Sequence, residues 1–521
     1  MTPIMDQHLA VRRFLAEPAS YPARPRSVEL IETHISCVFV ADSLVYKLKK
    51  PVRFEFVDFS TLAARHAACL EEVRLNRRLA PAVYLGVLPI TAAADGALAL
   101  DGEGQPVDWV VQMLRLPTDR TLEARVRSGT VSHDEVAELS RVLGDFYAAA
   151  PPVAIDAVEY RREIEHHVRA NREELLAASS TEQMADVRRA HAAQLQLLML
   201  RPELFDDRVR RGRIIDGHGD LRPEHICLTA PPVVFDCLEF DARLRQLDVA
   251  DELSFLAMEC ERLGAAEIGR KVRDACLARC GDDPPAALLK FYESYRACVR
   301  AKVAALRRGQ LSAGADNPLA REASDDLRLA ARDARDFSRP IVLVASGLMG
   351  SGKSTVATAL AETFGVSIVS TDALRRELFG ASRQAEKYNA GAYAPENRQR
   401  VYEELFGRAE AFLNAGESVV LDGTFLSAGS VRRILSLAGA AGARLLVIRC
   451  RCDELVARQR IPARLAAGTD LSEARPELFD KQRAEVDEIP AEVAHLVLDT
   501  TGSLADQVQR VVKELRKIVR R

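Results

Sequence analysis

A glycine-rich segment constrains the fold of this chain more than any other feature of its sequence. The segment is GLMGSGKS, residues 347–354, which follows the apolar run IVLVAS and precedes the helical pattern TVATALAETF. It fits the motif GxxxxGK followed by Ser or Thr, in which glycines let backbone N–H groups surround a phosphate at the start of a helix. The strand, loop and helix together predict a nucleotide-binding site in an α/β domain.

Apolar runs alternate with helical segments in this part of the chain. After IVLVAS come VSIVS, SVVLD, ARLLVIRC and AHLVLD. Short, continuous apolar runs of this kind are typical of strands in a parallel sheet that helices cover on both faces. We therefore expect residues 340–521 to form an α/β P-loop NTPase domain with a doubly wound parallel sheet.

The loop and the strand ends supply the candidate site residues of this domain. Lys353 would reach the β and γ phosphates, while Ser354 and Asp422, at the end of SVVLD, would hold Mg²⁺. Asp372, in STDALR, could accept the proton of a substrate hydroxyl or could cap the following helix. The residues predicted to bind the nucleotide are Gly347, Leu348, Met349, Gly350, Ser351, Gly352, Lys353, Ser354 and Thr355.

An arginine-rich segment, residues 457–482, breaks the alternation of strands and helices. A mobile lid of this composition could bring Arg458, Arg460 or Arg464 to the transferred phosphoryl group. Any one of these arginines could equally be a solvated surface charge. We select Arg464 as the catalytic candidate.

Residues from about Pro340 to Val512 resemble the small P-loop kinases grouped with gluconate kinase, polynucleotide 5′-hydroxyl kinase and the zeta-toxin sugar-nucleotide kinases. The resemblance rests on GLMGSGKST, STDALR, VVLDGTF and the arginine-rich segment with LSEA. It implies that Asp372 acts on the substrate hydroxyl and that lid arginines clamp the phosphates. It favours a kinase over a motor ATPase or a GTPase and leaves the acceptor open.

A second candidate site lies in the first half of the chain, at HGDLRPEH, residues 218–225. Asp220 falls at a predicted turn, and Asp236 follows the apolar residues VVF, so the two carboxylates could converge. One would orient an acceptor hydroxyl, and the other would hold a metal on the nucleotide phosphates.

Phosphotransferases of the protein-kinase type also need a lysine on an early strand and a glutamate on the next helix. The alternating run SLVYKLKKP offers Lys47, with Lys49 on the same face as the alternative. The helical run CLEEVRLNRRL offers Glu72, with Glu71 as the alternative. Lys47 and Glu72 are therefore predicted to bind the cofactor.

Residues 30–305 resemble the aminoglycoside phosphotransferase family, above all at HGDL and VVFDCLEF. The resemblance implies a protein-kinase-like α+β fold with Asp220 as the catalytic aspartate and Asp236 as a metal ligand. It also implies that Asp248 and Glu252 brace the loop. His225 stands where the family has a metal-binding asparagine. Imidazole suits Mn²⁺ or Zn²⁺ better than Mg²⁺, so His225 would retune the metal site, disable it, or simply pack under the loop.

The two halves together resemble bacterial fusions of an aminoglycoside phosphotransferase-like domain with a P-loop kinase, described as bifunctional ATP-binding proteins. We expect a kinase-like domain at 1–307, a partly helical linker at 308–339 and the P-loop domain at 340–521. The leading hypothesis is an ATP-dependent kinase with two sites, in which the P-loop half phosphorylates a hydroxyl of a small polar substrate. In one alternative, the first half is a pseudokinase or metabolite-binding module that regulates the second. In another, the protein is a zeta-toxin-like kinase acting on nucleotide sugars or RNA ends.

Composition narrows the partners and the location. The chain has 72 basic and 75 acidic residues, which argues against DNA or an anionic membrane as the main partner. The sequence contains no apolar run long enough to cross a bilayer and no CxxC pair among its ten cysteines. We expect a cytoplasmic protein that binds a small substrate, ATP and Mg²⁺, with Mn²⁺ as an option at the N-terminal site.

Overall fold

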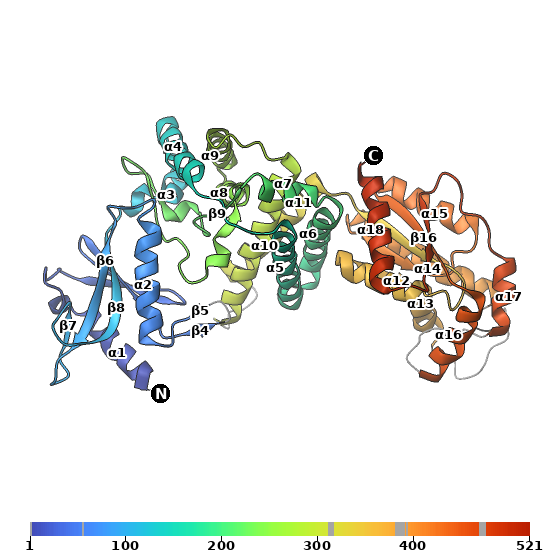
Figure 1. The fold of residues 1–521 in the computed structure, drawn as a ribbon, viewed down its shortest axis with the longest axis horizontal. Coiled ribbons are helices and arrows are strands. Elements are labelled where there is room, and N and C mark those ends of the chain that lie inside the picture. The colour runs from blue at the N-terminus through green and yellow to red at the C-terminus, as the bar shows by residue number, and fades with distance from the viewer. Residues whose placement is uncertain are drawn as a thin grey trace. The chain divides into compact units, whose positions relative to one another are not determined.

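The computed structural model describes residues 3–54, 57–310, 317–380, 391, 394–467 and 476–520. The chain divides into two compact units, each built from two separate segments (Figure 1). The first unit is Met1–Asp156 with Arg208–Pro285, and the second is Ala157–Asp207 with Ala286–Arg521. The boundaries expected from the sequence, at 307 and 339, differ from these. The observed division assigns 157–207 and 286–307 to the unit that carries the phosphate loop.

The first unit contains an antiparallel sheet of six strands in the order β1-β2-β3-β8-β6-β7. Different helices cover its two faces. α1 covers one, where Leu48 of β3 packs with Leu15, and α2 covers the other, where Val73 lies. Side chains alternate between the faces of a strand, so Lys47 and Lys49 of β3 lie on the α2 side. The elements are α1 (Pro3–Ala16), β1 (Val28–Glu32), β2 (Ser36–Ala41), β3 (Leu44–Lys49), α2 (Leu62–Asn76), β6 (Tyr84–Ala92), β7 (Leu98–Leu100) and β8 (Gln105–Leu114).

Short strand pairs and helices complete the first unit. β10 pairs with β11 and β12 pairs with β9, both antiparallel. The HGD segment joins β9 to β10, and Asp236 follows β11 directly, so the chain brings the two predicted carboxylates to neighbouring turns. These elements are β4 (Arg53–Phe54), β5 (Val57–Asp58), α3 (Leu122–Arg127), α4 (His133–Ala149), β9 (Ile214–Asp216), β10 (Ile226–Cys227), β11 (Val233–Val234), β12 (Gln246–Asp248), α8 (Val249–Arg262) and α9 (Ala266–Arg279).

Four long helices belong to the second unit together with its sheet. α11 occupies most of the segment 308–339 that the sequence predicted to be a linker, and it packs against α10 and α6. Its buried Ala323, Leu327, Ala330 and Ala334 recur at helical spacing, which gives it an apolar face despite its many charges. The helices are α5 (Ala157–Ala178), α6 (Thr181–Leu200), α10 (Ala286–Gln310) and α11 (Pro318–Phe337), and α7 (Glu203–Arg210) spans the point where the chain changes unit.

The sheet of the second unit has five parallel strands in the order β14-β15-β13-β16-β17. This confirms the predicted doubly wound sheet, and all five apolar runs form its strands. α12 and α18 cover one face, and α14 and α15 cover the other. The elements are β13 (Ile341–Ser346), α12 (Lys353–Phe364), β14 (Ser367–Ser370), α13 (Thr371–Phe379), α14 (Pro395–Asn414), β15 (Val419–Asp422), α15 (Ala428–Ala440), β16 (Arg444–Arg451), α16 (Glu454–Ala467), α17 (Pro476–Ala484), β17 (His495–Asp499) and α18 (Leu504–Arg520).

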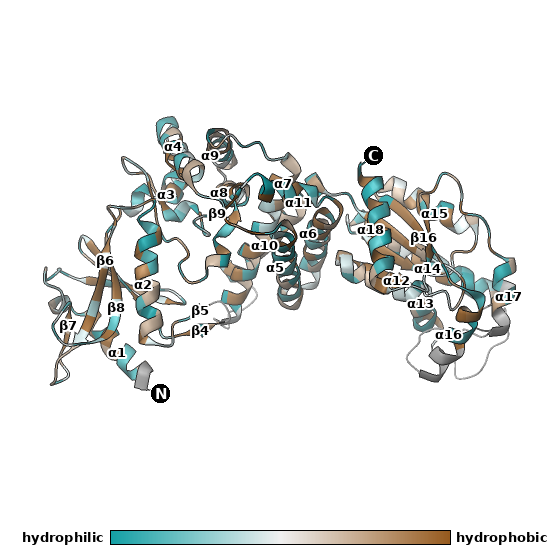
Figure 2. Ribbon diagram, viewed as in Figure 1, coloured by the Kyte–Doolittle hydropathy of each residue, from teal (hydrophilic) through white to brown (hydrophobic). Residues whose placement is uncertain are grey.

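Hydropathy follows this layering. Figure 2 shows apolar colour along β16 and hydrophilic colour on α18, which carries polar residues on its outer side. Among the residues that the structure describes, no helix combines the length and the apolar character that crossing a bilayer requires.

Candidate functional site

The phosphate loop lies between β13 and α12, at the carboxyl end of the parallel sheet. Gly350 and Gly352 have φ values of 73° and 81°. A Cβ atom on Gly350 would lie 2.6 Å from the carbonyl oxygen of Ala457, so both angle and space require glycine there. α12 starts at Lys353 without a side-chain cap. The first N–H groups of this helix are therefore available to an anion.

Asp422 ends β15 beside this loop and is 4% exposed. Burial raises the pKa of Asp422 above its ordinary value, although Lys353 and a hydrogen bond from Ser354 oppose that shift. Its Oδ1 atom is buried and has no hydrogen-bond partner among the described residues. A buried carboxylate oxygen next to a serine hydroxyl suits a hard divalent cation that also binds phosphate. These residues therefore fit Mg²⁺.

Asp372 lies in the first turn of α13, directly after the neighbouring strand β14, and its backbone N–H is linked to the Asp422 carboxylate through Ser370. The Ser370 hydroxyl donates to Asp422 Oδ2 at 3.2 Å and accepts a hydrogen bond from the Asp372 N–H at 3.3 Å. Ser370 is therefore the cap of α13, and the Asp372 carboxylate instead pairs with Arg375 at 2.5 Å. One carboxylate thus ends β15, and the other follows the adjacent strand β14. The one on Asp372 is not used to cap the helix.

Among the candidate lid arginines, Arg460 lies against the phosphate loop. Its guanidinium donates to Thr500 Oγ1 at 3.2 Å and to the Thr500 carbonyl at 2.9 Å. The Thr500 hydroxyl in turn donates to the Ser351 carbonyl at 2.8 Å. Arg458 pairs with acidic residues of α16 and α17 instead, and the side chain of Arg464 lies outside the described residues. Sequence reasoning missed Thr500, whose only signal is that it follows the last strand.

A cleft of about 610 Å³ opens beside this site, between α14 and the segment after β15. Tyr402 in its wall lies with its hydroxyl 3.1 Å from Thr424 Oγ1 and accepts a hydrogen bond from the Phe425 N–H at 3.1 Å. Phe425 has a φ of 42°, which an aromatic residue adopts only under constraint. The cleft also presents Arg398 and Arg433. It can therefore hold a polar molecule next to the phosphate loop.

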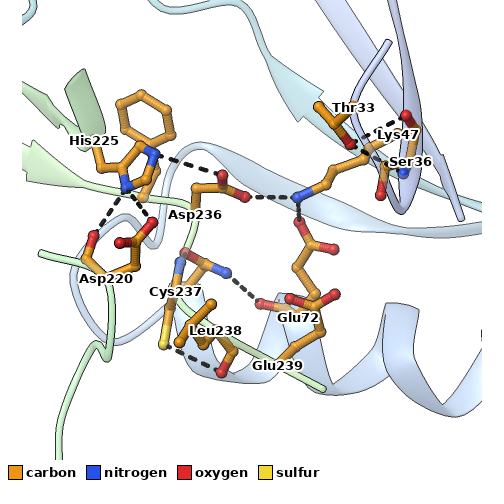
Figure 3. A network of polar contacts seen from close by, with 12 residues as sticks. Thr33, Ser36, Lys47, Glu72, Asp220, His225, Asp236, Cys237, Leu238 and Glu239 are labelled. Atoms are coloured by element: carbon orange, nitrogen blue, oxygen red, sulfur yellow. Dashed lines mark hydrogen bonds and ion pairs between the residues drawn. The ribbon is translucent and has the colours of Figure 1, made fainter. Parts of the chain in front are cut away.

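The N-terminal candidate residues also come together (Figure 3). Lys47 Nζ lies 2.8 Å from Glu72 Oε1 and 2.6 Å from Asp236 Oδ1. Lys49 shares the same face of β3 and contacts Glu72 and Glu239. The two lysines therefore share one glutamate, and only Lys47 also reaches Asp236.

Asp236 is held ionised in an uncommon backbone conformation. Its φ is 63°, in the left-handed region. Although burial opposes ionisation, Lys47 and then His225 hold the pKa of Asp236 well below its usual range. The Asp236 N–H donates to the Tyr84 hydroxyl at 3.1 Å, and the following N–H donates to Asn76 Oδ1 at 2.9 Å. These contacts fix the turn that presents the carboxylate.

His225 lies between the two aspartates (Figure 3). Its Nδ1 is 2.9 Å from the backbone oxygen of Asp220 and must donate to it, because a carbonyl oxygen only accepts. Its Nε2 is 3.7 Å from Asp236 Oδ2 and 3.6 Å from Glu224 Oε1. A neutral ring would direct the Nε2 lone pair toward two carboxylates, and either a proton or a metal cation would satisfy that arrangement.

No group of three or more His, Cys, Asp or Glu side chains is placed to hold a metal by itself within the part of the chain that the structure describes. A metal at His225 and Asp236 would therefore need further oxygen ligands from a nucleotide. The residues fit that requirement, since a metal in a kinase site takes one or two protein ligands and completes its shell with phosphates and water.

Hydrogen bonds to buried side chains hold the HGD loop, residues 218–220, in place. Glu252 accepts hydrogen bonds from the N–H groups of His218 and Gly219 and from the Tyr147 hydroxyl. His218 Nε2 lies 2.9 Å from the carbonyl oxygen of Phe235, and burial lowers the pKa of His218 to about 4. The bracing role predicted for Glu252 is what the structure shows, and His218 is a buried, neutral member of the same brace.

Sequence reasoning missed three members of this site. Tyr84 and Asn76 gave no signal, because both act on backbone N–H groups of a turn that only the fold creates. Glu239 did leave a signal, since it stands three residues after Asp236 in VVFDCLEF. Its carboxylate faces Lys49 and is neutralised there.

Comparisons with known proteins agree with part of this picture. Residues 342–489 match the family model described as an AAA domain. Solved structures similar to this chain include a gluconokinase from Sinorhizobium meliloti 1021, with 21% identity over 34% of this chain and 93% of that one, and a TM-score of 0.26. They also include the Mycobacterium tuberculosis APS kinase CysC in complex with AMPPNP and APS, with 20% identity over 34% of this chain and 98% of that one, and a TM-score of 0.26.

Full-length relatives extend across both units. The uncharacterized protein Rv2004c of Mycobacterium tuberculosis (strain ATCC 25618 / H37Rv) is 33% identical over 451 residues, which cover 85% of this chain and 87% of that protein. The uncharacterized protein Mb2027c of Mycobacterium bovis (strain ATCC BAA-935 / AF2122/97) gives the same values. Because the identity holds over most of both chains, this chain belongs to the same protein family as Rv2004c.

Proposed function

We propose that this protein is an ATP-dependent kinase whose phosphate-loop site transfers the γ-phosphoryl group of ATP to a hydroxyl of a small polar substrate. The observation that carries the proposal is that Asp422 ends β15 and Asp372 follows the adjacent strand beside the phosphate loop, where Ser370 hydrogen-bonds to the Asp422 carboxylate and to the Asp372 N–H. One carboxylate suffices to hold a metal for ATP hydrolysis. A second one, which interacts electrostatically with the cleft residue Tyr402, favours transfer to a hydroxyl group.

Each residue has a chemical role in this proposal. Lys353 would bind the β and γ phosphate oxygens, and Arg460 would bind phosphate oxygens from the other side of the loop. Ser354 and Asp422 would hold Mg²⁺, which supplies charge neutralisation on the phosphates. Asp372 would accept the proton as the acceptor oxygen forms its bond to phosphorus and the bond to the β-phosphate oxygen breaks.

The test compares Lys353→Ala with the unmodified site in the full-length chain. Both proteins carry Asp220→Asn, so that the N-terminal site does not contribute. Lys353→Ala should lower ATP-dependent phosphate transfer by roughly 10²- to 10³-fold, measured as ADP release and as mass gain of the acceptor. Lys513→Ala, an exposed lysine on α18, is the matched control and should retain full activity. Unchanged transfer by Lys353→Ala would refute the assignment.

We propose the N-terminal site as a second phosphotransferase site of the protein-kinase type. The observation that favours it is Lys47, which bridges Glu72 and Asp236 while Asp220 lies on the far side of His225. In this role Lys47 would bind phosphate, Asp220 would take the acceptor proton, and Asp236 with His225 Nε2 would hold the metal. The alternative is a module that binds nucleotide or metabolite without turnover.

The full-length chain with Lys353→Ala isolates this second site. Metal-dependent turnover that disappears on Asp220→Asn supports an enzyme, whereas nucleotide binding without turnover supports the module. Because imidazole nitrogen suits Mn²⁺ better than Mg²⁺, His225→Asn should shift the preference from Mn²⁺ toward Mg²⁺. Equilibrium binding of the metal–nucleotide complex, measured beside the rate, shows the same shift if His225 is a ligand. An identical preference in both proteins would mean that His225 only packs under the loop.

A further inference from the structure

Arg449 is a buried arginine near the carboxyl end of β16, in the second unit's sheet. It is 5% exposed, and its buried Nη1 atom has no hydrogen-bond partner among the described residues. The other buried arginines in the described ranges all contact carboxylates. They are Arg65 with Asp108, Arg208 with Asp248, Arg245 with Asp216, Arg273 with Asp274, and Arg300 with Glu322.

An uncompensated buried charge is costly, and native structures rarely keep one without a function. Burial lowers the pKa of Arg449, and Asp487 is the carboxylate that partly offsets this. The Asp487 carboxylate is already engaged, because it accepts a hydrogen bond from the Ala428 N–H at 2.9 Å. The guanidinium of Arg449 therefore lacks an anion of its own among the described residues.

The position of Arg449 points to the ligand edge of the sheet. In the register of β13 and β16, Arg449 stands opposite Ser346, the residue directly before the phosphate loop. Side chains alternate along a strand, so both lie on the face of Val344 and Val447, which α14 and α15 cover. The Ser346 hydroxyl is likewise buried and has no hydrogen-bond partner among the residues that the structure covers. Open α/β sheets bind ligands at this carboxyl edge.

The cleft between α14 and the segment after β15 opens on the same face of the sheet. Leu426 lines this cleft, and its carbonyl accepts a hydrogen bond at 2.9 Å from the N–H of Asp487. Asp487 is the residue whose carboxylate interacts electrostatically with Arg449. Arg433, on α15, also lines the cleft, with its guanidinium carbon 4.5 Å from the centre of the Phe406 ring. Arg398 and Arg433 thus line the cleft together with Glu403 and Glu485. The hydrogen bond between Asp487 and Leu426 joins the cleft wall to the segment whose carboxylate interacts with Arg449.

We propose that Arg449 binds an anionic group of the acceptor, a carboxylate or a phosphate, so that the substrate is a hydroxylated anion and not a neutral polyol. A guanidinium presents two parallel N–H donors that match either group. This inference rests on the proposed kinase function, because that function is what requires an acceptor substrate. The same chemistry could be supplied by the phosphates of the nucleotide, and the experiment separates these two sources.

Stability of the ligand-free, full-length protein gives a test that does not depend on turnover. Arg449→Met removes an unpaired buried charge and keeps the side-chain volume, so the Tm should rise. Arg300→Met is the matched control: Arg300 is buried and ion-paired at 2.9 Å, and its replacement should lower the Tm because it breaks that ion pair. A fall in Tm for Arg449→Met, as in the control, would show a structural arginine and overturn the proposal.

Selectivity gives the second test. Transfer from ATP is measured on matched acceptors that differ in charge: gluconate and glucitol, glycerate and glycerol, glucose 6-phosphate and glucose. The unmodified protein should prefer the anionic member of a pair, mainly through KM. Arg449→Met should reduce that preference by about 10- to 100-fold, the value of one charge-assisted contact, and Arg449→Lys should keep part of it. Equal use of both members by the unmodified protein would overturn the proposal.

Two further outcomes separate the sources and the hypotheses. If Arg449→Met weakens ATP binding and leaves the preference within pairs unchanged, the anion is a nucleotide phosphate and the acceptor proposal is overturned. If the unmodified protein phosphorylates no compound, the proposed kinase function is refuted. Anion binding by Arg449 is then tested through the effect of the anion on the Tm. In the presence of AMPPNP, glycerate or gluconate should then raise the Tm of the unmodified protein and not that of Arg449→Met. The absence of this difference would overturn the proposal.

Discussion

At the scale of single residues, the buried polar groups at the two ends of the second unit's sheet differ in their hydrogen bonding. Ser418 is buried, accepts hydrogen bonds from Gln196 Nε2 at 2.8 Å and from the Ile341 N–H at 2.9 Å, and lies at the amino end of the sheet. Asp422 Oδ1 and Arg449 Nη1 are equally buried, lack such partners within the described part of the chain and lie toward the carboxyl end. Buried polar atoms are nearly always paired, so the second group marks where ligands are required.

His191 in α6 predicts how this unit responds to acid. The side chain is fully buried, its Nδ1 lies 2.7 Å from the Val187 carbonyl oxygen, and burial lowers its pKa from 6.5 to about 4. Above pH 6.5 both folded and unfolded states hold it neutral. As the pH falls from 6.5 to 4, only the unfolded state takes up the proton, so stability should drop by up to about 3 kcal/mol.

His191→Asn keeps a donor for the Val187 carbonyl and removes the titration. The urea midpoint of the second unit, compared between pH 7 and pH 4.5, should therefore fall less in this variant than in the unmodified chain. His495→Asn, which changes an exposed histidine, serves as the control and should leave the pH dependence unchanged. The same fall in all three proteins would contradict the prediction.

Residue-level prediction from sequence succeeded where a periodic pattern orients a side chain. Alternation along β3 placed Lys47 on the face of Glu72, and it also placed Lys49 there, so the two could not be distinguished without the position of Asp236. The support for that aspartate could not be predicted. Its turn has a positive φ and is held by Tyr84, which is far away in the sequence.

At the scale of elements, α12 is held at both of its ends. Its first residue, Lys353, belongs to the phosphate loop, while Arg169 of α5 donates to the carbonyls of Glu362 and Thr363 at its last turn, at 2.9 and 2.8 Å. A cation there satisfies terminal carbonyls and interacts favourably with the helix dipole. The helix that presents its N-terminus to phosphate is therefore anchored by a residue from the first half of the chain.

Element prediction was reliable for the parallel sheet, because each strand is a continuous apolar run between helical patterns. It was less informative for 308–339, where Gly, Asn, Pro and many charges suggested a linker. α11 nevertheless buries an apolar face made mostly of alanines. Alanine contributes little hydrophobicity for each residue, so such a face gives a weak signal even though it packs well.

At the scale of the whole molecule, the sequence identified helices in 157–207 and 286–307 and could not show which sheet they accompany. An amphipathic pattern shows that a helix buries one face, but it does not identify the element against which that face packs. In the structure α6 packs against α12 and α18, and Leu200 of α6 is a member of the core that holds Leu446 and Val511. The P-loop part and these helices therefore share one hydrophobic core.

This sharing predicts that the P-loop part, residues 340–521, is not an independent folding unit. Without α6 it loses Leu200 from its core, the hydrogen bond from Gln196 to Ser418, and the contact from Arg516 Nε to the Met199 carbonyl at 2.9 Å. Loss of one buried leucine side chain alone typically costs about 2 to 5 kcal/mol. Residues 340–521 expressed alone should therefore melt well below the second unit in the intact chain, or aggregate.

Supplying residues 157–207 and 286–339 should restore a single cooperative transition, measured by calorimetry and by the oligomeric state in solution. Equal Tm values with and without these helices would show that the sheet and its own helices suffice.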